Sequence, residues 1–300
     1  MNRILVITLS NIGDLVMTTP VFEALYTVYP HAVIDVVADK RSSDVLKGAP
    51  YLGKIYHREK KGGLVRFFRL IFELRKTYYD AVIDLRTNII PSMLRSHKRI
   101  YKRKRLFSEQ HSVDEHYSSL SKLDKLASIP SECRVYVEEA ARSEAAELIK
   151  GLCGQKILAI GPGANWPGKI WPASKFEDLV VDLTDYFDGV IQLGASGEGL
   201  VFSDRVKINC IDLTGKTTLA VLKAVLDNSQ VFVGNDSGLG HLAAALGKPS
   251  VTVFGKGDPS RYKPWGHRAV AVVAPLRDLN RLEYPVVSDA IKQVQKEHGS

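Results

Sequence analysis

The sequence predicts an α/β protein with two doubly wound parallel sheets, and three observations support that prediction. Short runs of apolar, β-branched residues alternate with longer segments of helical periodicity along most of the chain. Many of the runs are continuously apolar, which is typical of strands that helices cover on both faces. The alternation lapses between residues 128 and 156 and then restarts, so the 300 residues divide into two domains near residue 150.

The expected strands follow in chain order. Those of the first half are Arg3–Leu9, Val33–Ala38, Lys54–His57 and Ala81–Leu85. Those of the second half are Ile157–Ile160, Val190–Leu193, Ile208–Asp212, Val231–Val233 and Val251–Phe254. A helix is expected over Gly62–Thr77, where Leu64, Phe67, Phe68 and Ile71 recur at helical spacing, and this stripe is expected to face the core.

Composition narrows the class of protein. Hydrophobic residues make up 45% and charged residues 25% of the chain, as in ordinary globular proteins. The three cysteines are too far apart for a paired metal-binding motif, and such sparse cysteine fits a reducing cytosol. Asn11, Gly13 and Asp14 interrupt the apolar N-terminus before a signal peptide forms, and no apolar run approaches membrane-spanning length. A soluble cytoplasmic protein without a metal site is expected.

The basic charge is concentrated in the first half. Residues 1–150 hold 25 Lys and Arg against 18 Asp and Glu, whereas residues 151–300 hold 16 against 15. Lys54–Lys76 carries eight basic residues, and a second, shorter stretch consists of Arg95, Lys98, Arg99, Lys102, Arg103, Lys104 and Arg105. No nucleic-acid recognition motif accompanies them, so nucleic acid is not expected as a partner. A solvated basic face is the structural alternative.

Three loops follow strands and carry polar residues where ligands of parallel sheets bind. The first is Ser10–Asp14, in which Asp14 lies at a helix N-terminus. Its carboxylate can accept a proton from a hydroxyl group, or it can simply cap the helix. The second is Gly161–Pro172, in which Lys169 can neutralise a phosphate. The tryptophans of this loop are either ligand contacts or packing anchors.

The third loop, Gly234–His241, has the most specific pattern. A strand runs into Asp236, Ser237 and Gly238, and a helix of small residues follows, so the first amides of that helix can bind an anion. A competing interpretation is a dinucleotide fingerprint, Gly-x-Gly-x-x-Ala, at Gly238–Ala243 with Asp258 as the ribose-binding acid. That fingerprint normally follows the first strand of its fold, whereas here it follows a late strand, so the pattern favours phosphate binding over NAD.

Four motifs in the same order resemble glycosyltransferase family 9, the heptosyltransferases of lipopolysaccharide inner-core assembly. Asp236–His241 with the following strand is similar to the family's Asp-Thr/Ser-Gly-x-x-His signature, and Lys169–Pro172 to its Lys-x-Trp-Pro element. Ser10–Asp14 with Thr19-Pro20 looks like the N-terminal motif, and Thr214–Leu219 matches a recurrent stretch.

The resemblance implies the GT-B fold, two Rossmann-like domains with parallel sheets facing across a cleft. Residues 1–150 would bind the acceptor and residues 151–285 the nucleotide sugar, and residues 286–300 would form a helix crossing back to the first domain. The implied reaction is an inverting, metal-independent transfer of heptose from ADP-heptose, with the ADP-sugar as substrate and no cofactor.

The same resemblance assigns roles to residues of this chain. Asp14 would be the general base, and Lys169 would hold the diphosphate and stabilise the departing ADP. The remaining donor-binding residues would be Asn165, Glu198, Lys216, Thr217, Asp236, Ser237, Gly238 and His241. Ser237 stands where threonine is more usual, and the C-terminus lacks a cysteine-bearing segment found in many relatives; these departures leave the acceptor open.

Other functions remain as alternatives at this point. One is a family relative that uses another nucleotide sugar or an acceptor outside lipopolysaccharide. A second is an NAD-binding oxidoreductase, and a third is a nucleotide-binding module without catalysis. Under the main hypothesis the basic first half meets an anionic glycolipid acceptor. We therefore expect it to dock peripherally, by charge alone, at the inner face of the inner membrane.

Overall fold

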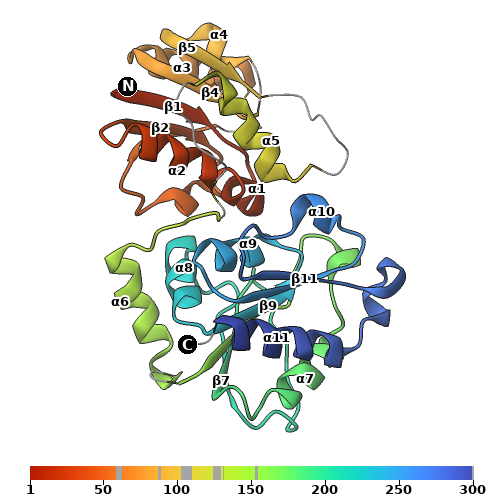
Figure 1. Cartoon of the computed structure of the whole chain (residues 1–300). Helices are drawn as coiled ribbons and strands as arrows, with labels where there is room; N and C mark the ends of the chain where they lie inside the picture. The colour runs from red at the N-terminus through yellow and green to blue at the C-terminus, as the bar shows by residue number, and fades with distance from the viewer. Residues whose placement is uncertain are drawn as a thin grey trace. The chain divides into compact units, whose positions relative to one another are not determined.

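The computed structural model describes residues 1–58, 63–86, 89–102, 110–123, 130, 132–152 and 155–298. The chain forms two compact units, Met1–Tyr136 and Val137–Ser300 (Figure 1). Each unit is a parallel sheet with helices against it, which confirms the predicted α/β class. Within the described ranges, no helix combines the length and the hydrophobicity that crossing a membrane requires.

The first unit is built on five parallel strands in the order β3-β2-β1-β4-β5. The strands are β1 (Arg3–Ile7), β2 (Val33–Ala38), β3 (Leu52–His57), β4 (Tyr79–Asp84) and β5 (Ser96–Tyr101). The helices are α1 (Ile12–Val16), α2 (Thr19–Val28), α3 (Gly63–Arg75), α4 (Ile90–Met93) and α5 (Ser112–Ser118), with short 3₁₀ turns η1 (Ser43–Leu46) and η2 (Ser119–Lys122). The strand order reverses beside β1, so the loops that follow β1 and β4 diverge there.

The second unit repeats this winding with six parallel strands in the order β11-β10-β9-β6-β7-β8. The strands are β6 (Ile157–Gly161), β7 (Gly189–Gln192), β8 (Asn209–Asp212), β9 (Val231–Asn235), β10 (Ser250–Phe254) and β11 (Ala269–Val273). Here the order reverses between β6 and β9, and the two loops with the most specific sequence motifs follow these two strands.

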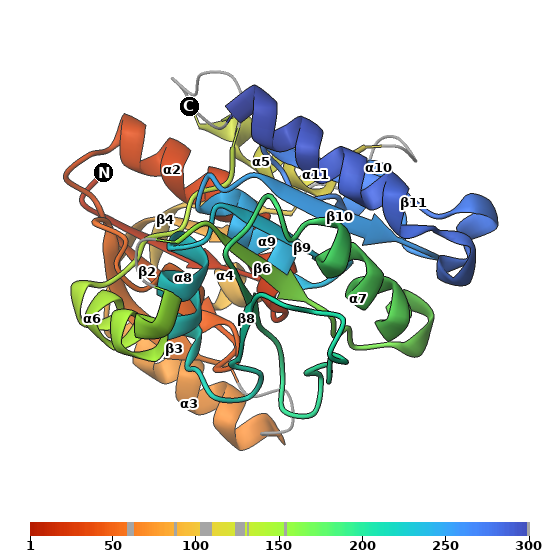
Figure 2. The same ribbon diagram turned by 90° about the horizontal axis from the view of Figure 1, so that it is seen from below.

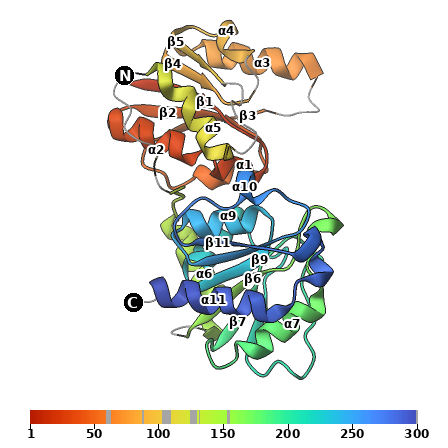
Figure 3. The same ribbon diagram turned by 45° about the vertical axis from the view of Figure 1, so that its right-hand side comes forward.

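Helices cover this second sheet. They are α6 (Glu139–Leu148), α7 (Ala173–Asp182), α8 (Leu219–Asp227), α9 (Gly238–Ala245), α10 (Pro259–Tyr262) and α11 (Tyr284–His298), with 3₁₀ turns η3 (Lys150–Leu152), η4 (Pro167–Lys169), η5 (Pro275–Arg277) and η6 (Leu279–Arg281). Helices α7 and α11 lie side by side (Figures 2 and 3), and α6 packs on α8.

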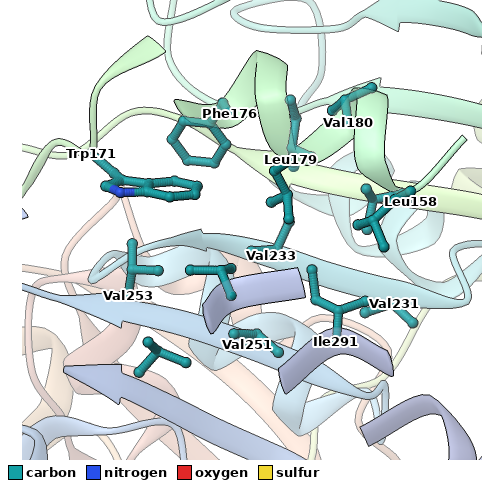
Figure 4. Close-up of a cluster of buried hydrophobic side chains, with 14 of the residues drawn as sticks. Leu158, Trp171, Phe176, Leu179, Val180, Val231, Val233, Val251, Val253 and Ile291 are labelled. Carbon is teal, nitrogen blue, oxygen red and sulfur yellow. The ribbon is translucent and has the colours of Figure 1, made fainter. Parts of the chain in front are cut away.

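The core of the second unit lies between the sheet and the α7–α11 pair. Figure 4 shows Phe176 and Leu179 of α7 and Ile291 of α11 approaching the strand residues Val233 and Val251. All of these side chains are shielded from solvent. Every residue of β6, β9 and β10 is buried, so these strands are closely packed and the loops at their carboxyl ends start from well-defined positions.

Nine strands match the sequence expectation to within two residues at each end. The two that the sequence did not indicate are β5 and β11, which are edge strands of their sheets. In β5, Ile100 is the one buried side chain, and the consecutive residues His97, Lys98 and Arg99 precede it. A charged edge strand discourages pairing with another sheet edge. It also lacks the apolar run by which the other strands were recognised.

The domain boundary differs from the predicted position near residue 150. The first unit ends at Tyr136, whose hydroxyl donates to the carboxylate of Glu23 in α2 (3.1 Å to Oε2). Helix α6 belongs to the second unit because it packs on α8, where Arg142 donates to Asp227 at 2.6 Å. The lapse in strand–helix alternation therefore lies partly within the second unit.

Helix α11 packs in the second unit. Residues 286–300 were predicted to form a helix that crosses back to the first domain; in the structure Val287, Ile291 and Val294 of α11 are buried in the core of the second unit. Ser288 and Lys292 of this helix both donate to Asp182 of α7, at 2.5 and 2.9 Å. These contacts make α11 part of the second unit.

The apolar stripe of α3 is only partly buried, contrary to the prediction. Phe67 and Ile71 pack on the first sheet, but Leu64 and Phe68 are exposed. The packed face is completed instead by Leu70 and Leu74. Successive helical residues turn by about 100°, so this packed face is rotated away from Leu64 and Phe68.

Candidate active site

The second unit gathers the loops that follow β6 and β9 at the point where its strand order reverses. The β6 loop runs through η4 to Trp171, and the β9 loop runs through Asp236 and Ser237 into α9. A parallel sheet binds ligands at such a reversal, because neighbouring loops turn to opposite faces and leave space between them.

Lys169 and Asp236, one from each loop, form an ion pair. The ammonium Nζ of Lys169 lies 2.5 Å from Oδ2 of Asp236. The Asp236 side chain is buried, whereas that of Lys169 is 28% exposed. A lysine held in this way is positioned at the strand ends, and part of its side chain is exposed, so an anionic ligand can approach it.

Asn235 fixes the two loops against each other. Its side-chain amide donates to the carbonyl of Pro162 at 2.6 Å, and its Oδ1 accepts from the backbone N–H of Trp171 at 3.0 Å. The residue is completely buried. Asn235 was not among the predicted site residues; the signal that could have indicated it is a polar residue at the carboxyl end of a buried central strand.

Ser237 is the N-cap residue of α9, and its side chain makes no cap hydrogen bond. Its Oγ is shielded from solvent and has no partner among the residues that the structure describes. The hydroxyl therefore lies beside the first free amides of the helix, starting with that of Gly238, where a phosphate oxygen can accept from both. His241 lies one turn further along α9 and is buried.

Glu198 lies against the β6 loop. Its carboxylate occupies the space that a Cβ on Gly163 or Gly194 would need, and its Oε2 accepts from the N–H of Ala195 at 2.7 Å. The structure thus brings Glu198 from the β7 loop to the start of the β6 loop. Glycine at position 163 allows this approach.

The other predicted donor residues lie on neighbouring loops of the same unit. Asn165 is exposed on the β6 loop. Lys216 and Thr217 follow β8, and Nζ of Lys216 donates to the backbone carbonyl of Asp212 at 2.7 Å. All three come after strand ends at the same edge of the sheet as Lys169.

The two tryptophans of the β6 loop have different environments. Trp171 is a packing anchor: it is buried, donates from Nε1 to the carbonyl of Leu282 at 2.9 Å and meets the Phe176 ring edge-on. Trp166 is partly exposed, its ring covers Gly168, and the Lys256 ammonium lies 5.6 Å from the ring centroid. Trp166 therefore presents an aromatic surface to solvent.

In the first unit, Asp14 lies in the first turn of α1, directly after β1. The N-cap residue is Asn11, and its side-chain amide donates to Oδ2 of Asp14 at 2.8 Å. Asp14 is thus not the helix cap. Its side chain is partly exposed, and the hydrogen bond from Asn11 orients its carboxylate. Its position is that of an acid at the strand-order reversal of the first sheet.

Charged residues that the sequence analysis did not single out lie at the same edge of the first sheet. Asp39 follows β2, Arg58 follows β3, and Arg86 follows β4. Burial and the neighbouring Arg58 lower the pKa of Arg86. Nη1 of Arg58 is shielded from solvent and has no partner within the described part of the chain. Their common signal in the sequence is a charged side chain within two residues of a strand end.

The predicted basic stretch Arg95–Arg105 includes the edge strand β5 and the residues on either side of it. Arg99 of β5 donates to the carbonyl of Leu94 at 3.1 Å, and Lys102 pairs with Glu115 of α5 at 2.9 Å. Arg95 and Lys98 lie on the same segment. Arg103, Lys104 and Arg105 lie outside the described residues. No group of three His, Cys, Asp or Glu that could hold a metal ion is found in the described ranges.

Comparison with known proteins identifies the family. The model of glycosyltransferase family 9 (heptosyltransferase) matches residues 67–290. The chain belongs to glycosyltransferase family 9. It is 26% identical to lipopolysaccharide heptosyltransferase 3 of Escherichia coli over 95% of this chain and 96% of that protein. The enzyme is therefore a glycosyltransferase, and the dinucleotide interpretation is abandoned: the Gly238–Ala243 pattern opens α9 after the fourth strand of its unit, and Asp258 caps α10.

Solved structures of the same family share the fold. The E. coli ADP-heptose lps heptosyltransferase II superposes with a TM-score of 0.82 at 21% identity, over 99% of this chain and 100% of that one. A family 9 glycosyltransferase from Veillonella parvula gives 0.84 at 21% identity, over 99% and 97%. At this identity the likeness establishes the fold, which is GT-B with two Rossmann-like units, as predicted.

Proposed function

We propose that this family 9 glycosyltransferase transfers heptose from ADP-heptose to the inner core of lipopolysaccharide. The names of its relatives support the donor and the product class. The single observation that supports it best within this chain is the convergence of Lys169, Asp236 and the Ser237 hydroxyl, which has no partner among the described residues, at the start of α9. A cation, a hydroxyl and free helical amides are the groups that a leaving diphosphate requires.

The donor would bind along the loops of the second unit. The diphosphate oxygens would take the hydrogen bonds of Ser237 and the α9 amides, and Lys169 would turn from Asp236 toward the negative charge that grows on ADP as it departs. Glu198, Lys216 and Thr217 would hold the nucleoside end, Asn165 would contact the phosphates, and His241 would complete the site. These charges are arranged before the substrate arrives, so little reorganisation is needed during the reaction.

Asp14 would act as the general base of a single displacement. The acceptor hydroxyl oxygen attacks the anomeric carbon, its proton passes to the Asp14 carboxylate, and the bond from that carbon to the diphosphate oxygen breaks. Attack from the side opposite the leaving group inverts the configuration at that carbon. The hydrogen bond from Asn11 would keep the carboxylate turned toward the hydroxyl.

The acceptor would be an anionic glycolipid bound by the first unit in the cytoplasm, with the enzyme peripheral to the inner membrane. The positive charge of residues 1–150 supports this placement, because each basic residue near an anionic leaflet contributes about 1 kcal/mol, screened by salt. Arg95, Lys98, Arg99 and Lys102 are on or beside the edge strand β5, from which charged side chains can reach such a surface.

A turnover screen tests the proposal. Purified enzyme is incubated with ADP-heptose and either Kdo-lipid A or a mono-heptosylated core, and ADP release is followed. We expect release with one acceptor and not with the donor alone. UDP- and GDP-sugars with the same acceptors serve as the comparison. Absence of ADP release with every core acceptor, or faster turnover of another nucleotide sugar, would contradict the proposal.

A further inference from the structure

Helix α3 of the first unit has an exposed apolar face that the glycosyl transfer does not explain. Leu64, Val65, Phe68 and Phe72 are 73, 73, 55 and 66% exposed. With about 100° between successive residues, these four side chains fall within one arc of about 100° around the helix. They form a continuous strip, which we call the α3 apolar strip, and monomeric proteins rarely expose strips of this kind without a use.

The remainder of α3 is divided between packing and charge. Phe67, Leu70, Ile71 and Leu74 form a separate arc that packs on the first sheet, so the apolar strip is not needed to hold the helix in place. Arg66, Arg69 and Glu73 of α3, with Lys76 just after its end, lie between these two arcs. Arg75, in the last turn, is exposed within the arc of the apolar strip. Lys76 pairs with Glu73 at 2.7 Å, and its ammonium lies 5.2 Å from the centroid of the Phe72 ring.

The apolar strip with basic residues beside it indicates which kind of partner binds this face of α3. A second copy of the chain on the strip would bring two sets of basic residues together, and their repulsion opposes such a dimer. An anionic leaflet can bind both kinds of side chain, because its acyl region buries apolar side chains and its phosphates pair with basic ones. Lys54 on β3 is a further basic residue of the first unit: the hydrogen bond from Lys76 lowers the pKa of the Glu73 carboxyl in α3, and Lys54 lies near enough to lower that pKa further.

We propose that α3 is an interfacial helix that inserts the α3 apolar strip into an anionic bilayer, with Arg66, Arg69 and Lys76 at the level of the lipid phosphates. At 13 residues, the helix is about 20 Å long and can lie in the plane of the interface. The inference extends the peripheral docking of the proposed function and replaces docking by charge alone. It does not depend on which sugar is transferred.

The test is sedimentation of the full chain with vesicles of phosphatidylethanolamine and phosphatidylglycerol. We compare the native chain, Phe68→Ser/Phe72→Ser, and the control Val201→Ser/Val286→Ser, which removes two exposed apolar side chains from the second unit. We expect the α3 variant to bind at least about tenfold more weakly and the control to bind like the native chain. The native chain should keep part of its binding at high salt.

Several results would overturn the inference. They are equal binding of the α3 variant and the native chain, complete loss of native binding at high salt, and a native dimer that Phe68→Ser/Phe72→Ser dissociates. A melting temperature shared by all three chains excludes misfolding as the cause of weaker binding.

A separate assay keeps this inference distinct from the proposed function. With a deacylated, water-soluble acceptor, Phe68→Ser/Phe72→Ser should release ADP at the native rate, and with acceptor in vesicles its KM should rise. If no core acceptor supports turnover but the native chain still binds vesicles through α3, the proposed function alone fails. If turnover is native-like in both formats, the interfacial helix alone fails.

Discussion

Lys169 and Asp236 form an ion pair, and a bound anion would compete with Asp236 for the Lys169 ammonium. Partial burial strengthens their attraction relative to water, yet the Asp236 carboxylate also holds the ammonium away from any anion that arrives. A diphosphate carries more negative charge than one carboxylate and can draw Lys169 toward itself. The pair therefore keeps the lysine ordered before the donor binds.

Replacement of Lys169 by Gln should remove charge from the leaving-group site without altering the loop. We expect kcat to fall by about 10²–10³, as for the loss of one group that stabilises transition-state charge. Initial-rate kinetics with ADP-heptose measure the change. Lys296→Gln, an exposed lysine of α11, is the matched control and should leave kcat unchanged. A small effect at Lys169 would show that the leaving ADP is stabilised elsewhere.

Asp14→Asn should separate catalysis from donor binding. The amide cannot accept the proton of the acceptor hydroxyl, so kcat should fall by about 10²–10⁴, whereas the dissociation constant of ADP should change little. Turnover kinetics and calorimetric titration with ADP measure the two quantities. Preserved turnover would leave Asp14 a structural residue of α1 and would assign the general base to another group.

Helices α7 and α11 are tied together at Asp182. The carboxylate accepts from the Ser288 hydroxyl at 2.5 Å and from the Lys292 ammonium at 2.9 Å, and these bonds lower the pKa of Asp182. Side chains of both helices also pack in the apolar core shown in Figure 4, so these hydrogen bonds add to an apolar contact between α7 and α11.

Asp182→Asn should weaken the hydrogen bonds between α7 and α11, and the loss of stability should depend on pH. At neutral pH we expect the free energy of unfolding to fall by roughly 0.5–1.5 kcal/mol, a range that allows for the partial exposure of both partners. Because the folded-state pKa is lowered, the native stabilisation is fully present above the ordinary aspartate pKa of about 4. It is lost as the pH falls through the lowered value.

Urea unfolding of both chains at several pH values tests this expectation. Asp185→Asn, just beyond the end of α7, is the matched control and should leave stability unchanged. A difference between native and Asp182→Asn chains that persisted below the lowered pKa would point to packing and not to the carboxylate.

Each unit has its own sheet and its own buried cluster of apolar side chains. A ligand stabilises the unit that holds it by an amount set by its concentration relative to its dissociation constant. The loops of the donor site belong to the second unit, whereas Asp14 belongs to the first.

ADP should therefore protect the second unit most strongly in hydrogen–deuterium exchange. We expect the largest slowing at amides of residues 161–172 and 234–241, and little at β1 to β5. The same measurement with adenosine, which lacks the diphosphate, should give weaker protection at the start of α9. Equal protection of both units by ADP would contradict placement of the nucleotide on the second unit.

Prediction from the sequence succeeded where the signal is local. The runs Val33–Ala38 and Val251–Phe254 are mostly apolar and β-branched, and both form buried strands inside the edges of their sheets. Prediction failed where contact with another element of the fold determines the structure. Ser96–Tyr101 is a strand because it pairs with β4 despite its charges. Helix α6 belongs to the second unit because it packs on α8.

The sequence alone determined the alternation of strands and helices, the two-fold repetition of the winding and the glycine and polar residues at the strand ends. These depend on side-chain periodicity and on residue types that a short segment carries by itself. Only the tertiary structure decided that Asn235 joins the loops at Pro162 and Trp171, and that Lys169 meets Asp236. It also decided which apolar arc of α3 packs and which stays exposed. Periodicity shows the faces that a helix has available, but the sheet against which it packs determines which face is buried.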